Sequence, residues 1–292
     1  MSEPEYRAPE SLDEALRIKA QYGADARVIA GGTDLILRMR DGVLSPGMLL
    51  DLRHLSLDTI SVQAGEIRIG AYVTHSQMMA SAEVGAMLPA LVEACKWFAG
   101  PPIRNRGTVA GNIVNASPAA DLLPPLIAYD ARIVLASSSG HRVLPLTDFF
   151  TGPGRTVLPP NEVLQEILVP RPPRLSAATF SKLGQRQSMA ISIVNLSTRL
   201  TLDPAGRVSG ARIVLGSVAP TVIRAAAAEA LLIGAELSTE RLGQAAQLAS
   251  GEISPISDVR SSGHYRRRVT EVLVRRALLA AWDELRGMAS HG

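Results

Sequence analysis

The chain has 292 residues, 47% of them hydrophobic, and a formal net charge of +3 at pH 7. A chain of this length can bury a core shared among two or three subdomains. The small net charge gives no reason to expect a nucleic-acid partner, and the apolar runs are too short for a membrane-spanning helix. Residues 1–10 lack the basic and apolar regions of a secretory signal, so we expect a cytoplasmic protein.

The cysteine and histidine content limits the chemistry that this chain can carry. Cys95 is the only cysteine, so no intrachain disulfide can form, and a two-iron cluster needs about four cysteine ligands. The five histidines show neither HxxxH nor HxxH spacing, so we expect no metal site. Any redox chemistry of this chain must therefore use an organic cofactor.

The N-terminal part of the chain predicts short strands alternating with helices. The capping-box pattern of residues 11–14 starts a helix that Gly23 ends. Residues 27–30 predict a buried strand that runs through a glycine turn into a second helix at 35–40. A further strand is expected at 48–53.

The middle part predicts more strands, one helical stretch and a long loop. Thr74 and Gln77 form a second capping-box pattern, which starts a helical stretch that extends with one break to Phe98. Two prolines end that stretch, and a glycine-bearing loop follows at 104–112. The strands are expected at 59–63 and 66–71 as a pair, and at 132–137, 141–146 and 163–169.

Residues 170–174, Pro-Arg-Pro-Pro-Arg, predict a linker, and the pattern changes beyond them. We expect a boundary near 172–176 and an α+β organisation. The expected elements after the boundary are a meander of strands at 179–183, 191–202 and 208–219, and helices at about 221–233, 238–250 and 262–286.

Residues 30–35, Ala-Gly-Gly-Thr-Asp-Leu, have the composition of a diphosphate loop. Two adjacent glycines let the backbone approach a ligand closely, and the following helix start adds N–H donors. Thr33 supplies a hydroxyl. A plain strand-to-helix turn explains the same pattern equally well.

Residues 107–112, together with Ser117 and Asp121, form a second candidate segment. Its small residues leave space for a flavin ring or a ribityl chain, and its polar side chains can bond sugar hydroxyls. Considered alone, the segment favours an ordinary loop. Neither segment has the GxGxxG fingerprint and the chain has no P-loop motif, which disfavours a Rossmann fold.

Taken together, these segments resemble the FAD-binding subunit of the xanthine dehydrogenase and carbon monoxide dehydrogenase family of molybdenum hydroxylases. The resemblance covers almost the whole chain. The matching segments, in order, are AGGTDL at 30–35, IGAYVTH at 69–75, WFAG at 97–100, IRNRGTVAGN at 103–112, ASPAAD at 116–121, and Asp258, Arg260, Ser261, Ser262, Tyr265 and Arg266 near the C-terminus.

The resemblance implies a fold and its division into domains. Residues 1–173 would form an FAD-binding domain of the vanillyl-alcohol-oxidase type (PCMH type), with two α/β subdomains at about 1–56 and 57–173. Residues 174–292 would form a smaller α+β domain with a sheet and three helices.

The resemblance also implies one FAD, bound non-covalently. Residues 30–35 would hold its diphosphate, Asp121 would bond a sugar hydroxyl, and residues 189–192 would face the ring. The residues implied to bind the cofactor are Ala30, Gly31, Gly32, Thr33, Asp34, Leu35, Phe98, Thr108, Val109, Ala110, Gly111, Asn112, Ser117, Asp121, Leu164 and Lys182.

The implied function is electron transfer, with no catalytic residue and no metal ligand on this chain. A large partner subunit would carry the molybdenum cofactor and oxidise the substrate, and a small iron–sulfur partner would carry two [2Fe–2S] clusters. Electrons would pass through the clusters to this FAD and then to NAD, a quinone or another acceptor. The expected assembly is a dimer of heterotrimers.

The sequence departs from the family pattern at two places. Ala110 stands where the family usually has a glycine, and its methyl group fits if φ stays negative there. Some family members place a Lys or Tyr against the flavin from the second domain, but residues 188–192, Ser-Met-Ala-Ile-Ser, contain neither. The electron acceptor therefore stays open.

Several candidate residues have simpler interpretations. His75 follows a helix cap, so a capping or packing role is favoured over a covalent flavin link. Cys95 fits a core thiol, and Asp34 a helix cap. The arginines at 266–268 and 275–276 indicate a solvated face or a subunit contact, and Tyr265 and Arg266 could instead brace the second domain.

Two other functions are alternatives to the electron-transfer hypothesis. A stand-alone flavoprotein oxidase or reductase of the same fold would need its own acid or base beside the flavin, and the sequence offers no convincing candidate. A non-enzymatic scaffold or nucleotide-binding module would stay colourless when FAD is added.

Overall fold

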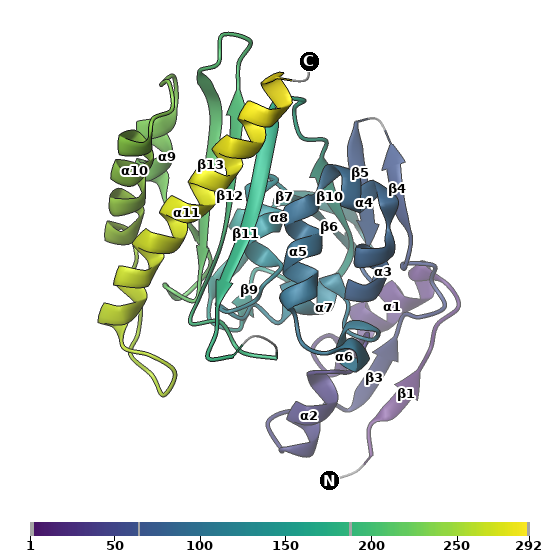
Figure 1. The fold of residues 1–292 in the computed structure, drawn as a ribbon. Coiled ribbons are helices and arrows are strands. Elements are labelled where there is room, and N and C mark those ends of the chain that lie inside the picture. The colour runs from purple at the N-terminus through teal and green to yellow at the C-terminus, as the bar shows by residue number, and fades with distance from the viewer. Residues whose placement is uncertain (1–2, 64, 187–188, 291–292) are drawn as a thin grey trace.

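In the described part of the chain, three sheets of three to five strands follow one another, a two-stranded hairpin is inserted within the second, and most helices lie between or outside the sheets (Figure 1). The structure is a computed structural model and describes residues 3–63, 65–186 and 189–290. Within these ranges, no helix is both long and apolar enough to cross a membrane.

The N-terminal sheet is parallel, with the strand order β1–β3–β2. Its strands are β1 (Glu5–Arg7), β2 (Ala26–Ile29) and β3 (Met48–Asp51), connected by α1 (Leu12–Tyr22) and α2 (Leu35–Arg40). Ser11 caps α1, as predicted, by accepting a hydrogen bond from Glu14 N–H. The Glu14 carboxylate instead accepts from Glu10 N–H at 3.1 Å, so only half of the predicted capping box forms.

The second sheet is antiparallel and has the order β4–β5–β10–β6–β7. Its strands are β4 (Ile60–Gln63), β5 (Glu66–Gly70), β6 (Arg132–Ser137), β7 (Gly140–Pro145) and β10 (Val163–Pro170). A short hairpin of β8 (Phe150–Gly152) and β9 (Arg155–Thr156) follows the 3₁₀ turn η1 (Leu146–Asp148). The predicted strands of this region are all present within one or two residues.

The helical region between β5 and β6 differs from the sequence prediction in two ways. The stretch from Thr74 to Phe98 has two breaks instead of one, because Ser81 caps a new helix and Pro89 begins another. The predicted loop at 104–112 becomes helical from Val109 onward. The helices are α3 (His75–Ala80), α4 (Ala82–Met87), α5 (Pro89–Trp97), α6 (Pro101–Arg104), α7 (Val109–Val114) and α8 (Leu123–Ala128).

The third sheet is an antiparallel meander of four strands, as the sequence predicted in outline. Its strands are β11 (Ser176–Leu183), β12 (Val194–Leu202), β13 (Val208–Gly216) and β14 (Ile223–Arg224). The three predicted helices follow as α9 (Ala226–Leu232), α10 (Thr239–Gly251) and α11 (Gly263–Ser290). The expected α+β organisation, in which a smaller part with one sheet and three helices follows the first two sheets, is confirmed.

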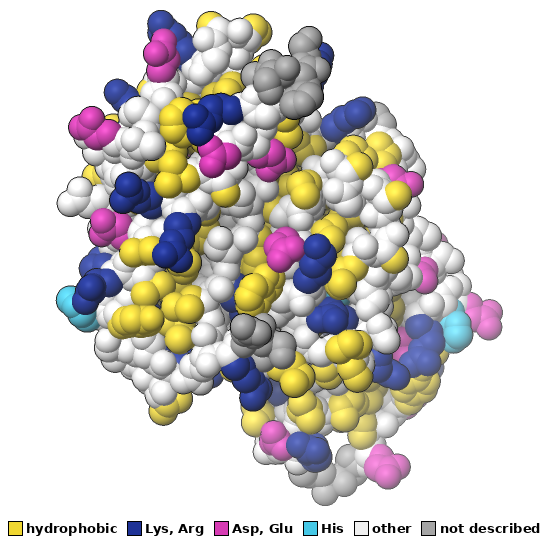
Figure 2. Space-filling model, viewed as in Figure 1, with side chains coloured by type: hydrophobic (Ala, Val, Ile, Leu, Met, Phe, Trp, Pro, Cys, Tyr) yellow, Lys and Arg dark blue, Asp and Glu magenta, His cyan; other side chains and the backbone are white. Residues whose placement is uncertain are grey.

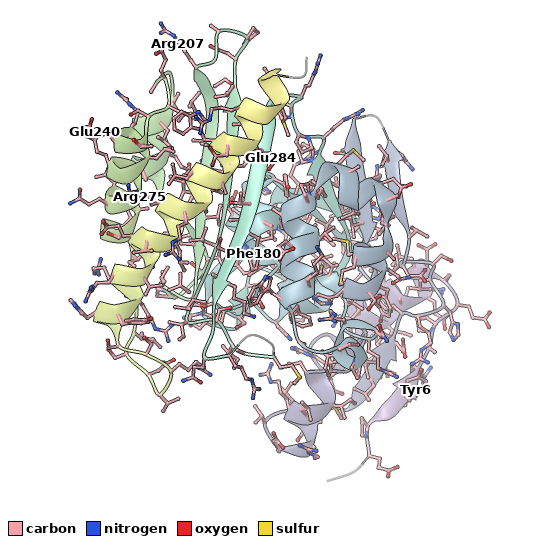
Figure 3. The ribbon with its side chains drawn as sticks, in the orientation of Figure 1. Tyr6, Phe180, Arg207, Glu240, Arg275 and Glu284 are labelled. Atoms are coloured by element: carbon pink, nitrogen blue, oxygen red, sulfur yellow. The ribbon has the colours of Figure 1, made fainter. Side chains whose placement is uncertain are left out.

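The elements stack in layers (Figure 1). Helices α9, α10 and α11 cover one face of the third sheet, and α5 and α8 lie between its other face and the second sheet. Phe180 of β11, labelled in Figure 3, and Val214 of β13 belong to the same hydrophobic core as α5, α8 and the second sheet. A separate core lies under α9–α11, and a small third core lies around α1 and the N-terminal sheet.

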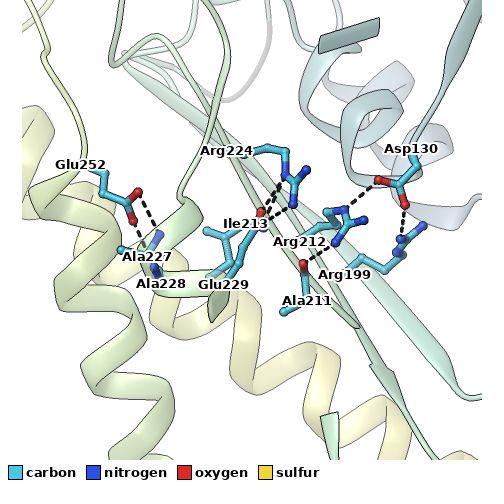
Figure 4. A network of polar contacts seen from close by, with 10 residues as sticks. All are labelled: Asp130, Arg199, Ala211, Arg212, Ile213, Arg224, Ala227, Ala228, Glu229 and Glu252. Atoms are coloured by element: carbon cyan, nitrogen blue, oxygen red, sulfur yellow. Dashed lines mark hydrogen bonds and ion pairs between the residues drawn. The ribbon is translucent and has the colours of Figure 1, made fainter. Parts of the chain in front are cut away.

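Charged side chains join the third sheet to the turn after α8 and to α9 (Figure 4). Asp130, in the turn after α8, accepts hydrogen bonds from Arg212 at 2.7 Å and from Arg199 at 2.5 Å. Glu229 is 5% exposed and accepts from the backbone N–H of Ile213 and from Arg224. We call Asp130, Arg199 and Arg212 the arginine clasp.

The division of the chain at residues 56 and 173 stays a proposal. The small N-terminal core favours the first division. The segment between the end of β10 at Pro170 and the start of β11 at Ser176 favours the second.

Candidate functional site

A cleft of about 750 Å³ lies where the N-terminal sheet, the second sheet and the start of the third sheet meet. Its walls include the loop after β2, the turn between α6 and α7, the segment before α8, and parts of β10 and β11. Cofactor sites commonly have volumes of about 300–1,000 Å³, so a dinucleotide is within reach of this cleft.

Two glycine-bearing loops touch at one wall of the cleft. A Cβ atom built on Gly31 would lie only 1.8 Å from the carbonyl oxygen of Arg106. The Arg106 guanidinium donates a hydrogen bond back to Gly31 O at 3.3 Å. Gly32 has φ of +71°, a conformation that residues with side chains rarely adopt. Glycine is thus required at position 31 because the Arg106 backbone lies so close, and at position 32 because φ is positive there.

The second loop leads into α7 at the cleft. Thr108 caps this helix, with its Oγ1 accepting a hydrogen bond from Gly111 N–H at 3.0 Å. Ala110 lies within the helix, where φ is negative, so the alanine that replaces the family's glycine fits without strain. Asn112 lines the cleft, and its buried Oδ1 has no hydrogen-bond partner in the structure. A buried polar atom without a partner indicates a position where a ligand or water supplies one.

Asp121 is held at the cleft by donors from β11, from β12 and from the segment between these strands. Its carboxylate accepts from Lys182 Nζ at 2.6 Å, Ser192 Oγ at 2.7 Å and Asn195 Nδ2 at 2.9 Å. The side chains of Lys182 and Asp121 are only 3% and 6% exposed. The pair therefore joins the first domain to the second inside the site.

His75 and Phe98 stack face to face beside the second loop. Their ring centroids are 3.9 Å apart, with an angle of 6° between the planes. His75 Nδ1 lies 2.7 Å from Gly107 O, while the buried Nε2 has no partner in the structure. Burial lowers the pKa of His75 to about 4, although the hydrogen bond to Gly107 opposes that shift. The ring is therefore neutral at physiological pH.

The predicted cofactor residues come together in this cleft, with one exception. Val109 is fully buried in the core and donates its backbone N–H to Val73 O. Of residues 189–192, which were predicted to face the ring, Met189, Ala190 and Ile191 line the cleft, but Ser192 does not and instead donates to Asp121; Ser188 lies outside the described residues. The predicted residues that line the cleft are Ala30, Gly31, Gly32, Thr33, Asp34, Leu35, Phe98, Thr108, Ala110, Gly111, Asn112, Ser117, Asp121, Leu164 and Lys182.

Sequence reasoning did not assign several residues that line the cleft. Tyr72 donates to Ile29 O and accepts from Leu52 N–H, which holds β2 and β3 against the cleft. Lys19 is 6% exposed and donates to two backbone carbonyls, and burial lowers its pKa to about 8. Tyr72 belongs to the matched segment 69–75, which could have indicated it. No local pattern marks Lys19, which reads as an ordinary helix residue.

The simpler roles predicted for Asp34, Cys95 and Arg266 can be compared with the contacts that these residues make. Asp34 stands at the N-cap of α2 but its side chain makes no capping bond, so the capping prediction for Asp34 is wrong; it lies 3.8 Å from Arg38 instead. Cys95 is a fully buried core thiol, as expected. Arg266 is 3% exposed and bonds Asp258, Ile193 O and Ser217 O, which confirms its bracing role.

The surface of α10 and α11 carries charges of both signs rather than a basic face. Figure 2 shows Lys, Arg, Asp and Glu side chains interspersed over these helices, and Figure 3 places Glu240 and Arg275 on their outer side. Among the described residues, no group of three or more His, Cys, Asp or Glu side chains could hold a metal ion.

Two protein-family models match this chain, one after the other along its length. The model of the "FAD binding domain in molybdopterin dehydrogenase" matches residues 2–172. The model of the "CO dehydrogenase flavoprotein C-terminal domain" matches residues 179–281.

Similar proteins cover nearly the whole chain. The 6-hydroxypseudooxynicotine dehydrogenase complex subunit alpha of Paenarthrobacter nicotinovorans is 34% identical over 97% of this chain and 95% of its own. The nicotinate dehydrogenase FAD-subunit of Eubacterium barkeri is 31% identical, covering 98% of this chain and 99% of its own. A solved chain of carbon monoxide dehydrogenase from Hydrogenophaga pseudoflava has a TM-score of 0.92 and 35% identity, covering 97% of this chain and 98% of its own.

Proposed function

We infer the function of this chain from its family: it belongs to the FAD-binding medium subunits of the molybdenum hydroxylases. It is therefore an oxidoreductase subunit, and FAD is the cofactor of its N-terminal domain. The fit of FAD to the cleft is supported by the contact of Gly31 with Arg106 O and by the unpartnered Oδ1 of Asn112.

We propose that the chain takes electrons from an iron–sulfur subunit and passes them to an external acceptor. FAD, when bound, supplies the redox chemistry, because it can accept and release electrons one or two at a time. The contribution of this chain is to bind and orient the cofactor. The observation that carries the proposal is the cleft itself, which gathers residues of the five matched segments between 30 and 121, together with Lys182 and residues 189–191, around one space.

The residues that would hold FAD are those predicted cofactor residues that line the cleft. Backbone N–H groups at Gly31, Gly32 and Thr33 would bind the diphosphate, because these residues line the cleft at the turn that leads into α2. Asn112 and Asp121 would bond polar groups of the cofactor. Val109 would support the second loop from behind.

The partners and the assembly are part of the same proposal. A molybdenum-cofactor subunit and an iron–sulfur subunit with two [2Fe–2S] clusters would complete the enzyme, as a dimer of heterotrimers in the cytoplasm. Relatives named as a subunit of a dehydrogenase complex and as a medium chain support a multi-subunit enzyme. The substrate would be selected by the molybdenum subunit.

We expect substitution of Gly31 by alanine to abolish FAD binding. The new methyl group would overlap Arg106 O, so the two loops must separate and the cradle opens. The apparent Kd for FAD should rise by a factor of about 100 or more, as measured by quenching of flavin fluorescence. Gly85→Ala is the matched control, because its added Cβ meets nothing within 4 Å and Gly85 does not line the cleft. Unchanged FAD affinity in Gly31→Ala would contradict the proposed cradle.

Electron transfer is tested by comparing the isolated chain with the complete complex. The FAD of the isolated chain should not be reduced by the substrate of the holoenzyme, whereas the co-purified complex should reduce it and pass electrons to an acceptor. Substrate oxidation by the isolated chain would favour a stand-alone flavoprotein oxidase or reductase instead.

A further inference from the structure

His75 has an unsatisfied acceptor at the wall of the cleft. The side chain lines the cleft, is only 1% exposed, and its Nε2 has no hydrogen-bond partner in the structure. Burying a polar atom without a hydrogen-bond partner has a free-energy cost. A residue in this state either binds a ligand atom through Nε2 or carries that cost without compensation.

The tautomer of His75 follows from its other nitrogen. Nδ1 lies 2.7 Å from Gly107 O, and a carbonyl oxygen can only accept, so Nδ1 carries the hydrogen. Because the ring is neutral, Nε2 has a lone pair and no hydrogen. The stack on Phe98 and the bond to Gly107 fix the ring orientation before any ligand arrives. Nε2 is thus a preorganised acceptor.

We propose that His75 is a cofactor-positioning residue whose Nε2 accepts a hydrogen bond from an O–H or N–H donor of FAD. The proposal rests on the proposed FAD site. It adds a side-chain contact from α3, an element to which the predicted cofactor residues do not belong. His75 also connects that contact to the second loop, because its Nδ1–H donates a hydrogen bond to Gly107 O of that loop.

Two substitutions separate the two nitrogens of the ring. Asn places an amide N–H about where Nδ1 lies, so His75→Asn can keep the bond to Gly107 but loses the acceptor at Nε2. Gln reaches about as far as Nε2, so His75→Gln can keep an acceptor there but loses the bond to Gly107. Both variants lose the stack on Phe98, so any difference between them does not come from stacking.

The experiment measures FAD affinity of the full chain by flavin fluorescence and checks the folding of each apo-protein by circular dichroism. We expect His75→Asn to bind FAD about tenfold more weakly than the parent, and His75→Gln to stay within about threefold. His141→Asn, at an exposed position outside the cleft, should bind like the parent and serves as the control. Parent-like affinity in His75→Asn, or equal weakening in both His75 variants, would overturn the proposal.

A second measurement keeps the test independent of variant folding. In the parent chain with ¹⁵N-labelled histidine, the Nε2 resonance of His75 should move upfield when FAD is added, while Nδ1 stays in place. An Nε2 resonance that FAD does not move would overturn the proposal. If the parent binds no FAD at all, the proposed function fails, which is a separate result from failure of the His75 contact alone.

Discussion

Gly31 and Gly32 are needed for different reasons, and only one of them could be read from the sequence. A positive φ at a glycine turn is predictable from residues 30–35, because the pattern of strand, glycines and helix requires it. The contact of Gly31 with Arg106 joins positions 75 residues apart, and no local pattern encodes such a distance. The same holds for Lys19 and for the orphaned nitrogen of His75, which depend on what packs around them.

At the same scale, His75 makes the stability of the chain sensitive to acid. Its folded pKa of about 4 lies below the ordinary value of 6.5, so between these values the unfolded chain binds a proton that the folded chain does not. Stability is therefore unaffected above pH 6.5 and falls as the pH drops below it. The contribution of His75 to this loss should be roughly 2 kcal/mol at pH 5.

Urea unfolding at pH 7.5 and pH 5 of the parent and of His75→Asn measures that contribution, because asparagine does not titrate. The difference in unfolding free energy between the two proteins should shift in favour of the variant at pH 5. An equal difference at both pH values would show that His75 is not buried in its neutral form.

At the scale of elements, the strands and their pairing were predicted better than the helical region between β5 and β6. The hairpin of β4 and β5 and the meander of β11–β13 follow from alternating patterns bounded by turns. The two breaks between α3 and α5 were missed in part, because apolar residues continue at helical spacing across both of them. Local capping by Ser81 and the start at Pro89 decide the break points there.

The arginine clasp should stabilise the contact between the third sheet and the turn after α8. Burial by itself raises the pKa of Asp130, but hydrogen bonds and charge from Arg212 and Arg199 outweigh it and leave the pKa below its ordinary value. Asp130→Asn keeps the size and tolerates the φ of +56° at this position, but removes the charge between two arginines. We expect a loss of about 1–2 kcal/mol, less than for a fully buried pair because the Asp130 side chain is 38% exposed.

Urea unfolding at neutral pH measures that loss. Asp283→Asn is the matched control, because Asp283 and Arg286 form an exposed pair on α11, and its effect should stay within about 0.5 kcal/mol. Equal effects of the two substitutions would show that the clasp contributes no more than a surface ion pair.

At the scale of the whole molecule, the fold class and the order of the domains could be predicted, but the layers could not. The linker after β10 and the change of pattern beyond it indicate two parts. That α8 lies between the second and third sheets could not be read from the sequence, because all six of its residues are buried and such a helix leaves no periodic signal. The residues of the site could be predicted in spite of this, because the resemblance to a family assigned them. No pattern in the sequence itself showed that they would lie close together.

The buried pair of Lys182 and Asp121 makes the two domains depend on each other. Lys182→Met should leave the Asp121 carboxylate buried with only Ser192 and Asn195 as donors, and we expect a loss of about 2–4 kcal/mol in urea unfolding without FAD. Adding Asp121→Asn to Lys182→Met should recover part of that loss, because no unpaired charge stays buried.

Lys96→Met is the control for the loss of a lysine. Lys96 and Glu93 form an exposed pair on α5, so its removal should change stability by less than about 1 kcal/mol. A double variant that is no more stable than Lys182→Met alone would show that the charge of Asp121 is not what destabilises the single variant.

The lining of the cleft runs from Lys19 to Ile191 along the chain. A ribosome that has synthesised the first loop, or even both glycine loops, has therefore made a protein that still lacks the lysine partner of Asp121. If Asp121 contacts the cofactor as proposed, firm capture of FAD should wait until β12 has left the exit tunnel, because Asn195 of that strand completes the environment of the carboxylate. We therefore expect cofactor loading to follow synthesis of the third sheet, and a chain truncated before that sheet should purify without the yellow colour of FAD.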